Sequence, residues 1–394
     1  MATSRERELR AIEEAHRAAQ ARIGVAGAYL AMYDWGAVST VDPGGTSSSW
    51  VNRSLRMINA IRRKSTRLAV SYIRLVRALE TGYTLGYPEY SDDPKALTMG
   101  VLRQQFTELL EEIAAITTEP TSAENADEQW FEAELRRIDD APARPNRIVM
   151  ADTTIDDQIK EFLDASSDND ADKVTVEDFT WTADMTPDQI EKSFQKFLEE
   201  DVIKPADKRA DLIRKSDLTP KQVMARIEKN HEAAGSTGGG LVDHYGISGG
   251  RQVLDQVIRR DRRVKVYARG TRPGCCAFCA MLAANGWYYR TKSGALTTSK
   301  TTSRTGQDMS PEMENGIRLY HPNCKCFVIV RYVDSSELPE TNAAFQKAWN
   351  ENIRNKFSYT TGKDGKGKNN AYNAWRKWLN QERRKDSTYN PKNR

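Results

Sequence analysis

Two long apolar stripes limit what the first hundred residues can form. Between Arg5 and Trp35, and again from Trp50 to Leu79, apolar side chains recur at steps of three and four residues. This is the periodicity of amphipathic α-helices rather than of strands. A Pro-Gly-Gly loop at 43–45 separates the two, and a third helix is expected from Ala96 to Ile116, opposing the second. Residues 1–118 are therefore predicted to form a helical assembly domain.

The polar side of the second stripe is strongly basic. Its members are Arg53, Arg56, Arg62, Arg63, Lys64, Arg67, Arg74 and Arg77. Charged helix faces are common and usually solvated, so a solvated face is favoured over a surface that binds nucleic acid or an acidic partner.

Charge is segregated along the chain, although the net charge of the 394 residues is only +4. Residues 119–184 are rich in Asp, Glu, Ser, Thr and Pro and predict an acidic linker or insertion with little core. Residues 185–235 predict a helical segment, because Thr-Pro pairs give capped helix starts at Pro187 and Pro220, the second helix reaching about Ala234. Residues 236–250 are glycine-rich and predict a hinge.

Gly246-Ile247-Ser248-Gly249-Gly250 spells the Gly-x-Ser-x-Gly pattern of a nucleophile elbow, with Asp243 and His244 just upstream. An elbow needs an apolar strand before the serine and a helix after it, whereas a run of glycines precedes this one. A flexible loop is favoured, and no catalytic residue is assigned. A serine-type protease that uses Ser248 and His244 is the alternative.

All five cysteines of the chain lie between residues 275 and 326. Two short turns can bring four ligands to one tetrahedral zinc ion: Cys276 and Cys279 from the first, His321 with Cys324 or Cys326 from the second. Four protein ligands leave no position for an activated water, so the ion would be a structural staple. Cys275 is then surplus. Buried thiols or a disulfide are the alternative, which a reducing cytoplasm disfavours.

A small αβ unit, residues 251–335, is predicted around these turns. It contains a helix over 280–285 ended by Gly286, a strand over 287–289 and a strand over 327–330. The fold class is thus α+β and mostly helical: long N-terminal helices, an acidic insertion and a small zinc-stapled αβ C-terminal domain.

Residues 336–394 predict a basic, aromatic C-terminal helix and tail. Phe345, Trp349, Ile353 and Phe357 form a helical stripe, and Trp375 or Trp378 could stack on an exposed base. The predicted nucleic-acid contacts are Lys363, Lys366, Lys368, Arg376, Lys377, Arg383 and Arg384. A terminal helix packed on the αβ unit, with a solvated basic end, explains the pattern equally well.

The segments Gly274–Ala283 and Tyr320–Cys326 give residues 250–332 a resemblance to the Mu F-like minor head proteins of tailed phages. The N-terminal helices resemble those of actinobacteriophage minor capsid and capsid maturation proteins. Cys275 and the acidic insertion depart from the family. The family's metal positions carry over to Cys276, Cys279, His321, Cys324 and Cys326.

The resemblance implies a structural minor capsid protein of the phage head, not an enzyme, acting at the portal or procapsid interior in head assembly and DNA packaging or ejection. The expected partners are the portal protein and the major capsid or scaffold protein, with double-stranded genomic DNA as a further candidate. The expected location is the virion, after assembly in the cytoplasm of the bacterial host. No membrane is expected, since no apolar run could span a bilayer and no secretory leader opens the chain.

Overall fold

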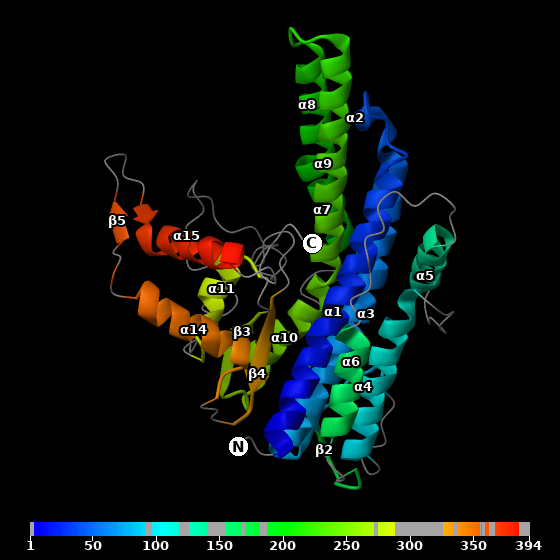
Figure 1. Cartoon of the computed structure of the whole chain (residues 1–394). Coiled ribbons are helices and arrows are strands. Elements are labelled where there is room, and N and C mark those ends of the chain that lie inside the picture. The colour runs from blue at the N-terminus through cyan, green and yellow to red at the C-terminus, as the bar shows by residue number, and fades with distance from the viewer. Residues whose placement is uncertain are drawn as a thin grey trace. The chain divides into compact units, whose positions relative to one another are not determined.

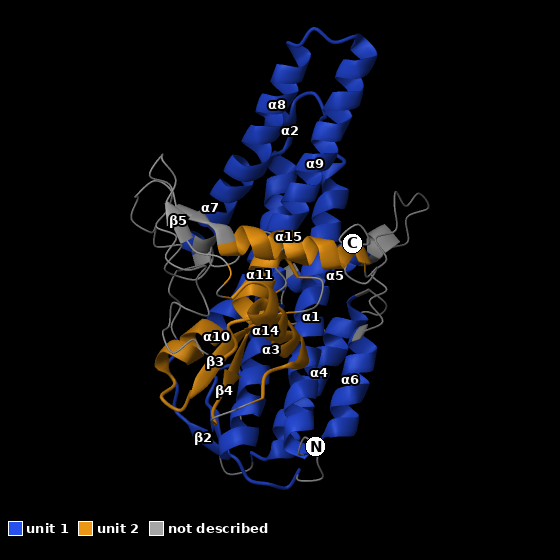
Figure 2. Ribbon diagram, turned by 60° about the vertical axis from the view of Figure 1, so that its left-hand side comes forward, with its two compact units in different colours: residues 1–253, 310–323 blue, residues 254–309, 324–394 orange. Residues whose placement is uncertain are grey.

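The computed structural model describes residues 4–90, 97–117, 126–139, 154–166, 170–181, 187–271, 275–287, 326–333, 337–354, 356, 359–361 and 367–385. The chain divides into two compact units (Figure 2). The larger comprises residues 1–253 and 310–323, and the smaller comprises residues 254–309 and 324–394.

The larger unit is built from helices (Figure 1). Its two longest N-terminal helices, α1 (Ser4–Trp35) and α3 (Ser48–Thr81), confirm the two predicted stripes, and α1 packs on both α3 and α9. The remaining elements are α2 (Pro43–Thr46), β1 (Tyr83–Leu85), α4 (Met99–Ala114), a 3-10 turn (Ala115–Thr117), α5 (Ala126–Asp139), α6 (Thr154–Ala165), β2 (Thr175–Glu177), α7 (Pro187–Leu198), a π-helical turn (Glu199–Ile203), α8 (Lys204–Arg214) and α9 (Pro220–Gly246). Strands β1 and β2 pair in parallel.

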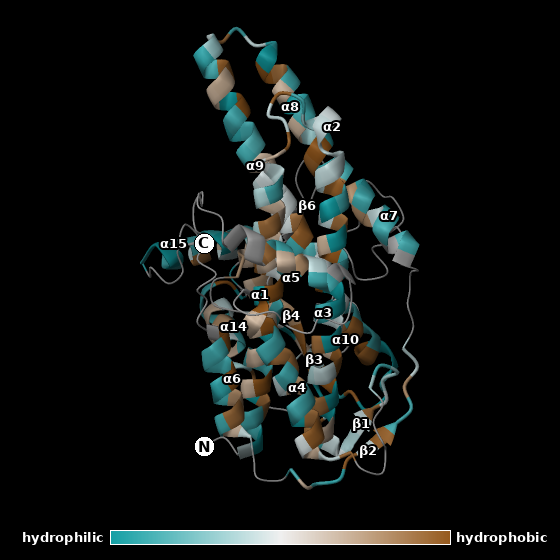
Figure 3. Ribbon diagram, turned by 90° about the vertical axis from the view of Figure 1, so that its right-hand side faces the viewer, coloured by the Kyte–Doolittle hydropathy of each residue, from teal (hydrophilic) through white to brown (hydrophobic). Residues whose placement is uncertain are grey.

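Apolar side chains of α1 and α3 form the centre of this unit. Ile12, Ile23, Ile58 and Leu68 are among the fully buried residues. Burial of each such side chain contributes roughly 1.5–3 kcal/mol, so the core, not helix propensity, stabilises these long helices. Figure 3 shows hydrophobic and hydrophilic residues alternating along the helices of this unit. Within the described ranges, no helix has both the length and the apolarity needed to cross a membrane.

The predicted glycine-rich hinge over residues 236–250 is wrong. Helix α9 continues to Gly246, well past Ala234, and α10 (Ser248–Arg260) follows almost at once. A Cβ atom on Gly238 would lie 2.6 Å from the Trp50 ring, and one on Gly246 would lie 2.4 Å from Ile61. The glycines therefore permit the close approach of α9 to α3, which offsets their cost of about 1 kcal/mol each within a helix.

The prediction that the acidic insertion contains little core is also wrong. Helices α5 and α6 bury Phe131, Leu135, Ile155 and Phe162 against the bundle. The rings of Phe106 and Phe162 meet edge to face at 5.4 Å. Carboxylates dilute the apolar pattern of these short helices, but the few apolar side chains still share one face.

The smaller unit mixes helices and short strands. Helix α10 begins in the larger unit and continues into this one. Strands β3 (Val266–Gly270) and β4 (Phe327–Arg331) pair antiparallel, with Val266 opposite Arg331 and Gly270 opposite Phe327. Its further elements are α11 (Ala277–Ala283), α14 (Glu340–Asn352), β5 (Tyr359–Thr361), β6 (Gly367–Asn369) and α15 (Asn370–Lys385), with β5 and β6 antiparallel.

Several predictions for the smaller unit are confirmed. Strand β4 and a short helix before Gly286, whose φ is 60°, stand where expected, although the helix starts earlier, at Ala277. Trp287 lies in a turn, and the rest of the predicted strand 287–289 falls outside the described residues. Phe345 and Ile353 are buried as their stripe predicts, while Phe357 also lies outside the described residues. The described residues from 337 to 385 belong to the same unit as the cysteine turn rather than to a separate tail.

Candidate functional site

The first cysteine turn caps helix α11. Cys276 is the N-cap residue, and its Sγ accepts a hydrogen bond from the backbone N–H of Cys279 at 3.3 Å. Cys279 is buried and Cys276 is half-buried. The turn therefore presents two thiols of the residue type that binds zinc in tetrahedral sites.

Two further cysteines are held in the same unit. Cys326, directly before β4, is buried, and its Sγ donates to Thr271 Oγ1 at 3.4 Å. The backbone carbonyl of Cys275 accepts a hydrogen bond from the Arg383 guanidinium. The four described cysteines are free thiols, so none of them forms the disulfide of the alternative interpretation.

The second predicted turn is described only at its last residue. His321 and Cys324 lie outside the described residues, so the structure does not test whether they meet Cys276 and Cys279. Among the residues that are described, no three His, Cys, Asp or Glu side chains form a group that could hold a metal. The donors at Cys276 and Cys279 fit half of a zinc site, and the zinc staple stays a prediction.

Helix α15 packs beside this turn through residues that sequence reasoning did not assign to it. Burial raises the pKa of Tyr372, and the charges of Cys276 and Cys279 add to that rise while Arg376 opposes it. The Tyr372 hydroxyl therefore shares the environment of both thiols. The available signal was the spacing of residues 372, 375, 379 and 383, which is one helical face of the tail.

Trp375 is a core residue, contrary to its predicted role in base stacking. Its side chain is fully buried, and its Nε1–H donates to the backbone carbonyl of Ala277 at 2.8 Å. Trp378 is half-buried and stacks on it, with ring centroids 5.0 Å apart. The helix-packing interpretation of the tail holds for this face because indole rings in a basic helix serve as packing groups when a core faces them.

The predicted nucleic-acid contacts divide among three settings. Arg376, Lys377 and Arg384 are exposed on α15. Arg383 is 8% exposed and bonded to the Cys275 carbonyl, so it stabilises the cysteine turn and is not available to a phosphate. Lys368 lies in β6, and Lys363 and Lys366 lie outside the described residues. DNA binding by the exposed bases stays a prediction.

Ser248 lies in a helical, buried setting. Its Oγ donates to the Tyr245 carbonyl at 2.6 Å and accepts from the Arg62 guanidinium. Burial lowers the pKa of Arg62 to about 10. His244 is buried, with Nδ1 3.4 Å from an Arg251 nitrogen. Helix α9, not a strand, precedes the serine, so the strand–turn–helix context of a nucleophile elbow does not surround it.

Only part of the basic side of α3 is the solvated face that the sequence predicts, because Arg56 and Arg63 are exposed but other members are buried. Lys64, Arg74 and Arg77 are each at most 2% exposed. Arg77 pairs with Glu177, and Arg74 donates to the Leu85 carbonyl at 2.9 Å. The counter-charges come largely from the acidic insertion, through Glu128, Glu132 and Glu177.

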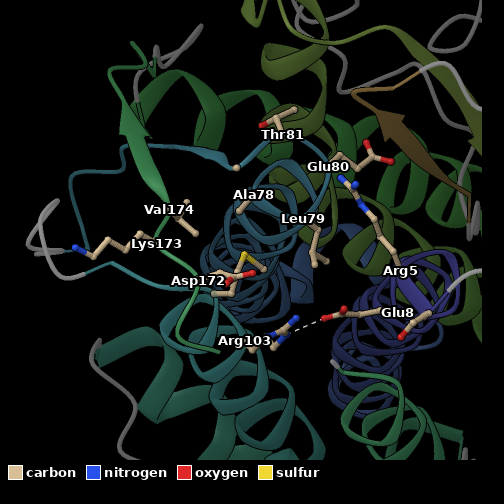
Figure 4. Close-up of a pocket in the computed structure, with 13 residues that line it drawn as sticks. Arg5, Glu8, Ala78, Leu79, Glu80, Thr81, Arg103, Asp172, Lys173 and Val174 are labelled. Atoms are coloured by element: carbon tan, nitrogen blue, oxygen red, sulfur yellow. Dashed lines mark hydrogen bonds and ion pairs between the residues drawn. The ribbon is translucent and has the colours of Figure 1, made fainter. Parts of the chain in front are cut away.

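A cavity of about 580 Å³ lies in the larger unit, near the start of α1 and the end of α3 (Figure 4). Its charged lining residues are Arg5, Glu8, Glu80, Arg103, Asp172 and Lys173. Arg103 donates to Glu8 at 2.7 Å and to Asp170 at 2.6 Å. The three cations and three carboxylates balance, so the cavity favours neither an anionic nor a cationic ligand.

One comparison with known proteins gives a match. A family model described as VG15 protein matches residues 182–352, which is less than half of the chain and runs from before α7 to the end of α14. No curated protein and no solved structure matches the chain significantly. The matched region includes Ser248 and all five cysteines. VG15 is a phage-associated family, and the class of protein that this similarity supports is a phage protein.

Proposed function

We propose that this chain is a structural minor capsid protein of a tailed phage, incorporated in the virion and acting at the portal or procapsid interior during head morphogenesis. The observation that supports it most is the similarity of residues 182–352 to a phage family, over the same stretch that has the cysteine pattern of minor head proteins. The proposed partners are the portal protein and the major capsid or scaffold protein.

The architecture supports a role in assembly rather than catalysis. The larger unit consists of long helices with fully buried interiors, which suit rigid protein–protein contacts. Ser248, the one serine with a nucleophile-like sequence, is buried and donates its proton to a backbone carbonyl. A hydroxyl committed in this way lacks the hydrogen bond to a base that a serine nucleophile needs.

We further propose a structural zinc ion in the smaller unit, held by Cys276, Cys279, His321 and either Cys324 or Cys326. Bound zinc would supply a cross-link, since four protein ligands leave no open position for a reacting water. The residues of this chain would then fix the start of α11 to the segment before β4. Trp375 and Arg383 would support the same turn from α15 through the carbonyls of Ala277 and Cys275.

The exposed bases Arg376, Lys377 and Arg384 are proposed to contact the phosphate backbone of packaged DNA. Lys and Arg side chains on a solvent-facing helix give sequence-independent, salt-sensitive affinity. The buried indole of Trp375 has no part in this contact.

The experiment is mass spectrometry of purified particles of the source phage, together with a null mutant of this gene. The intact chain should be found in particles in a few copies, and the mutant should accumulate misassembled or empty heads. Absence from particles together with normal heads would refute the proposal. Replacement of Ser248 by Ala separates the alternative: cleavage of head proteins should continue, whereas a serine protease would stop processing.

A further inference from the structure

Helix α5 packs against α3 and the 3-10 turn that follows α4. Its sequence, ADEQWFEAELRRID, is an amphipathic acidic segment. Phe131 and Leu135 are its buried apolar anchors among the described side chains. A helix of this length is marginal on its own in water. Helix α5 is therefore stabilised by packing into the groove that α3 and the end of α4 form.

One end of the groove is a buried cation. Lys64 on α3 is 2% exposed, and its Nζ lies 3.3 Å from Glu128 and 3.0 Å from Glu132, both on α5. It also pairs with Glu112 on α4. Arg67 lies 3.3 Å from Glu112 and 3.8 Å from Glu128. Glu128 and Glu132 are four residues apart, so one face of the helix presents both carboxylates to the same ammonium.

The other end of the groove recognises an aromatic ring and a further carboxylate. The guanidinium carbons of Arg56 and Arg53 lie 4.4 and 5.1 Å from the ring centroid of Trp130. Arg53 also donates to Glu134 at 2.8 Å while it binds Asp34 at 2.7 Å. The groove therefore contacts three features of α5: paired carboxylates, an indole close to two guanidinium groups, and apolar anchors.

The charges show that the groove is positive before α5 is added. Its own charged groups are Arg53, Arg56, Lys64 and Arg67 against Asp34 and Glu112. Glu128, Glu132 and Glu134 more than neutralise this excess and leave one carboxylate too many. Burial raises the pKa of Glu128, and the charges of Lys64 and Arg67 oppose that rise. Charge therefore attracts helix α5 to the groove.

We propose that the groove formed by α3 and the end of α4 is a recognition site for an acidic amphipathic helix, and that α5 occupies it as an intramolecular competitor. The partner is a protein segment that presents carboxylates at i and i+4 beside an aromatic residue. A nucleic acid fits less well, because phosphates cannot fill the apolar positions of Phe131 and Leu135. This site is separate from the cysteine turn. Its proposed partner is additional to the assembly role proposed above.

The test uses a fluorescent peptide of residues 126–139 and the full-length chain. In the chain, Glu132→Gln/Glu134→Gln removes the ion pairs to Lys64 and Arg53, weakens the resident helix and should raise affinity for the peptide about tenfold or more over the native chain, measured by fluorescence anisotropy. A peptide with the same two Gln substitutions should lose about the same factor. The matched control in the chain is Glu108→Gln/Glu111→Gln, because both glutamates are exposed on α4, and it should leave peptide binding at the native level.

Two further variants separate the possible outcomes. Adding Lys64→Met to the weakened chain should abolish peptide binding, because the buried ammonium is the principal anchor. If Glu132→Gln/Glu134→Gln lowers the helical circular dichroism signal, Trp130→Ala replaces it, since this change loosens α5 without touching the Lys64 cluster. Failure of the peptide to bind a folded, weakened chain would overturn the proposal. Tighter binding of a short DNA duplex than of the peptide would overturn the partner class.

Discussion

Helices α3 and α15 are both basic and amphipathic in sequence, yet the structure uses their charges in opposite ways. On α3, Lys64 and Arg77 are buried among carboxylates from other segments of the same chain. On α15, Arg376 and Lys377 are exposed. A basic run therefore indicates a partner of opposite charge but does not say whether that partner is part of the chain.

The largest expected effect concerns the turn beside α15. Elemental analysis of carefully reduced protein should find about one zinc per chain, because structural zinc sites bind with apparent free energies on the order of 10 kcal/mol. Chelation or Cys276→Ser/Cys279→Ser should remove the metal and the hydrogen-exchange protection of β3, β4 and α11. Protection of α1 and α3 should not change. Cys275→Ser, the matched control, should retain the metal, and a metal-free protein with unchanged protection would disprove the staple.

The second prediction tests the buried charge of α3. Lys64→Met should destabilise the chain by about 3–5 kcal/mol, because Glu128 and Glu132 are left buried without their cation. Arg63→Met, one residue away and exposed, should change the free energy of unfolding by no more than about 0.5 kcal/mol. Urea denaturation followed by circular dichroism measures both. Equal effects of the two substitutions would show that burial does not distinguish the α3 bases.

The third prediction tests the exposed charges of α15. Arg376→Ala/Lys377→Ala/Arg384→Ala should leave stability nearly unchanged but weaken duplex DNA binding and lower the slope of log affinity against log salt by about 0.9 per lost phosphate contact. Arg383→Ala is the contrasting variant. It should cost about 1–3 kcal/mol of stability, because the buried Cys275 carbonyl loses its donor. A DNA affinity that does not respond to the triple substitution would show that α15 is only a packing helix.

Local patterns predicted the elements that depend on neighbours along the chain. The apolar periods of α1 and α3, the capping box of Thr219 and Gln222, strand β4 and the Cys276–Cys279 turn are all encoded within a few residues. Each of these signals comes from hydrogen bonds or side-chain spacing inside one element, so no distant residue is needed to interpret it.

Contacts between distant residues account for the errors. Glycine composition cannot distinguish a hinge from close packing unless Trp50 and Ile61 are known to face α9. The acidic insertion looks unstructured in sequence because the partners of its carboxylates, Lys64 and Arg77, lie far away along the chain. The bond from Trp375 to the Ala277 carbonyl spans 98 residues, so no local pattern places α15 beside the cysteine turn.

The smallest expected effect is the pH dependence of the α3 cluster. Because burial raises the pKa of Glu128 in the folded chain, folding favours its protonated form, and this carboxyl's contribution to stability is lost as pH rises from its unfolded pKa through its folded pKa. Glu128→Gln removes that titration, so the Gln variant should gain stability relative to the native chain as pH rises above 4.5, the carboxyl's ordinary pKa. Denaturation at a series of pH values measures the difference. Asp211→Asn, near the end of α8, should show the opposite trend. The hydrogen bond from Lys215 lowers the pKa of Asp211, so the native chain should gain stability relative to the Asn variant as pH rises. If the stability of the native chain minus that of the Gln variant instead grows with pH, the ion pair with Lys64, rather than burial, controls the pKa of Glu128.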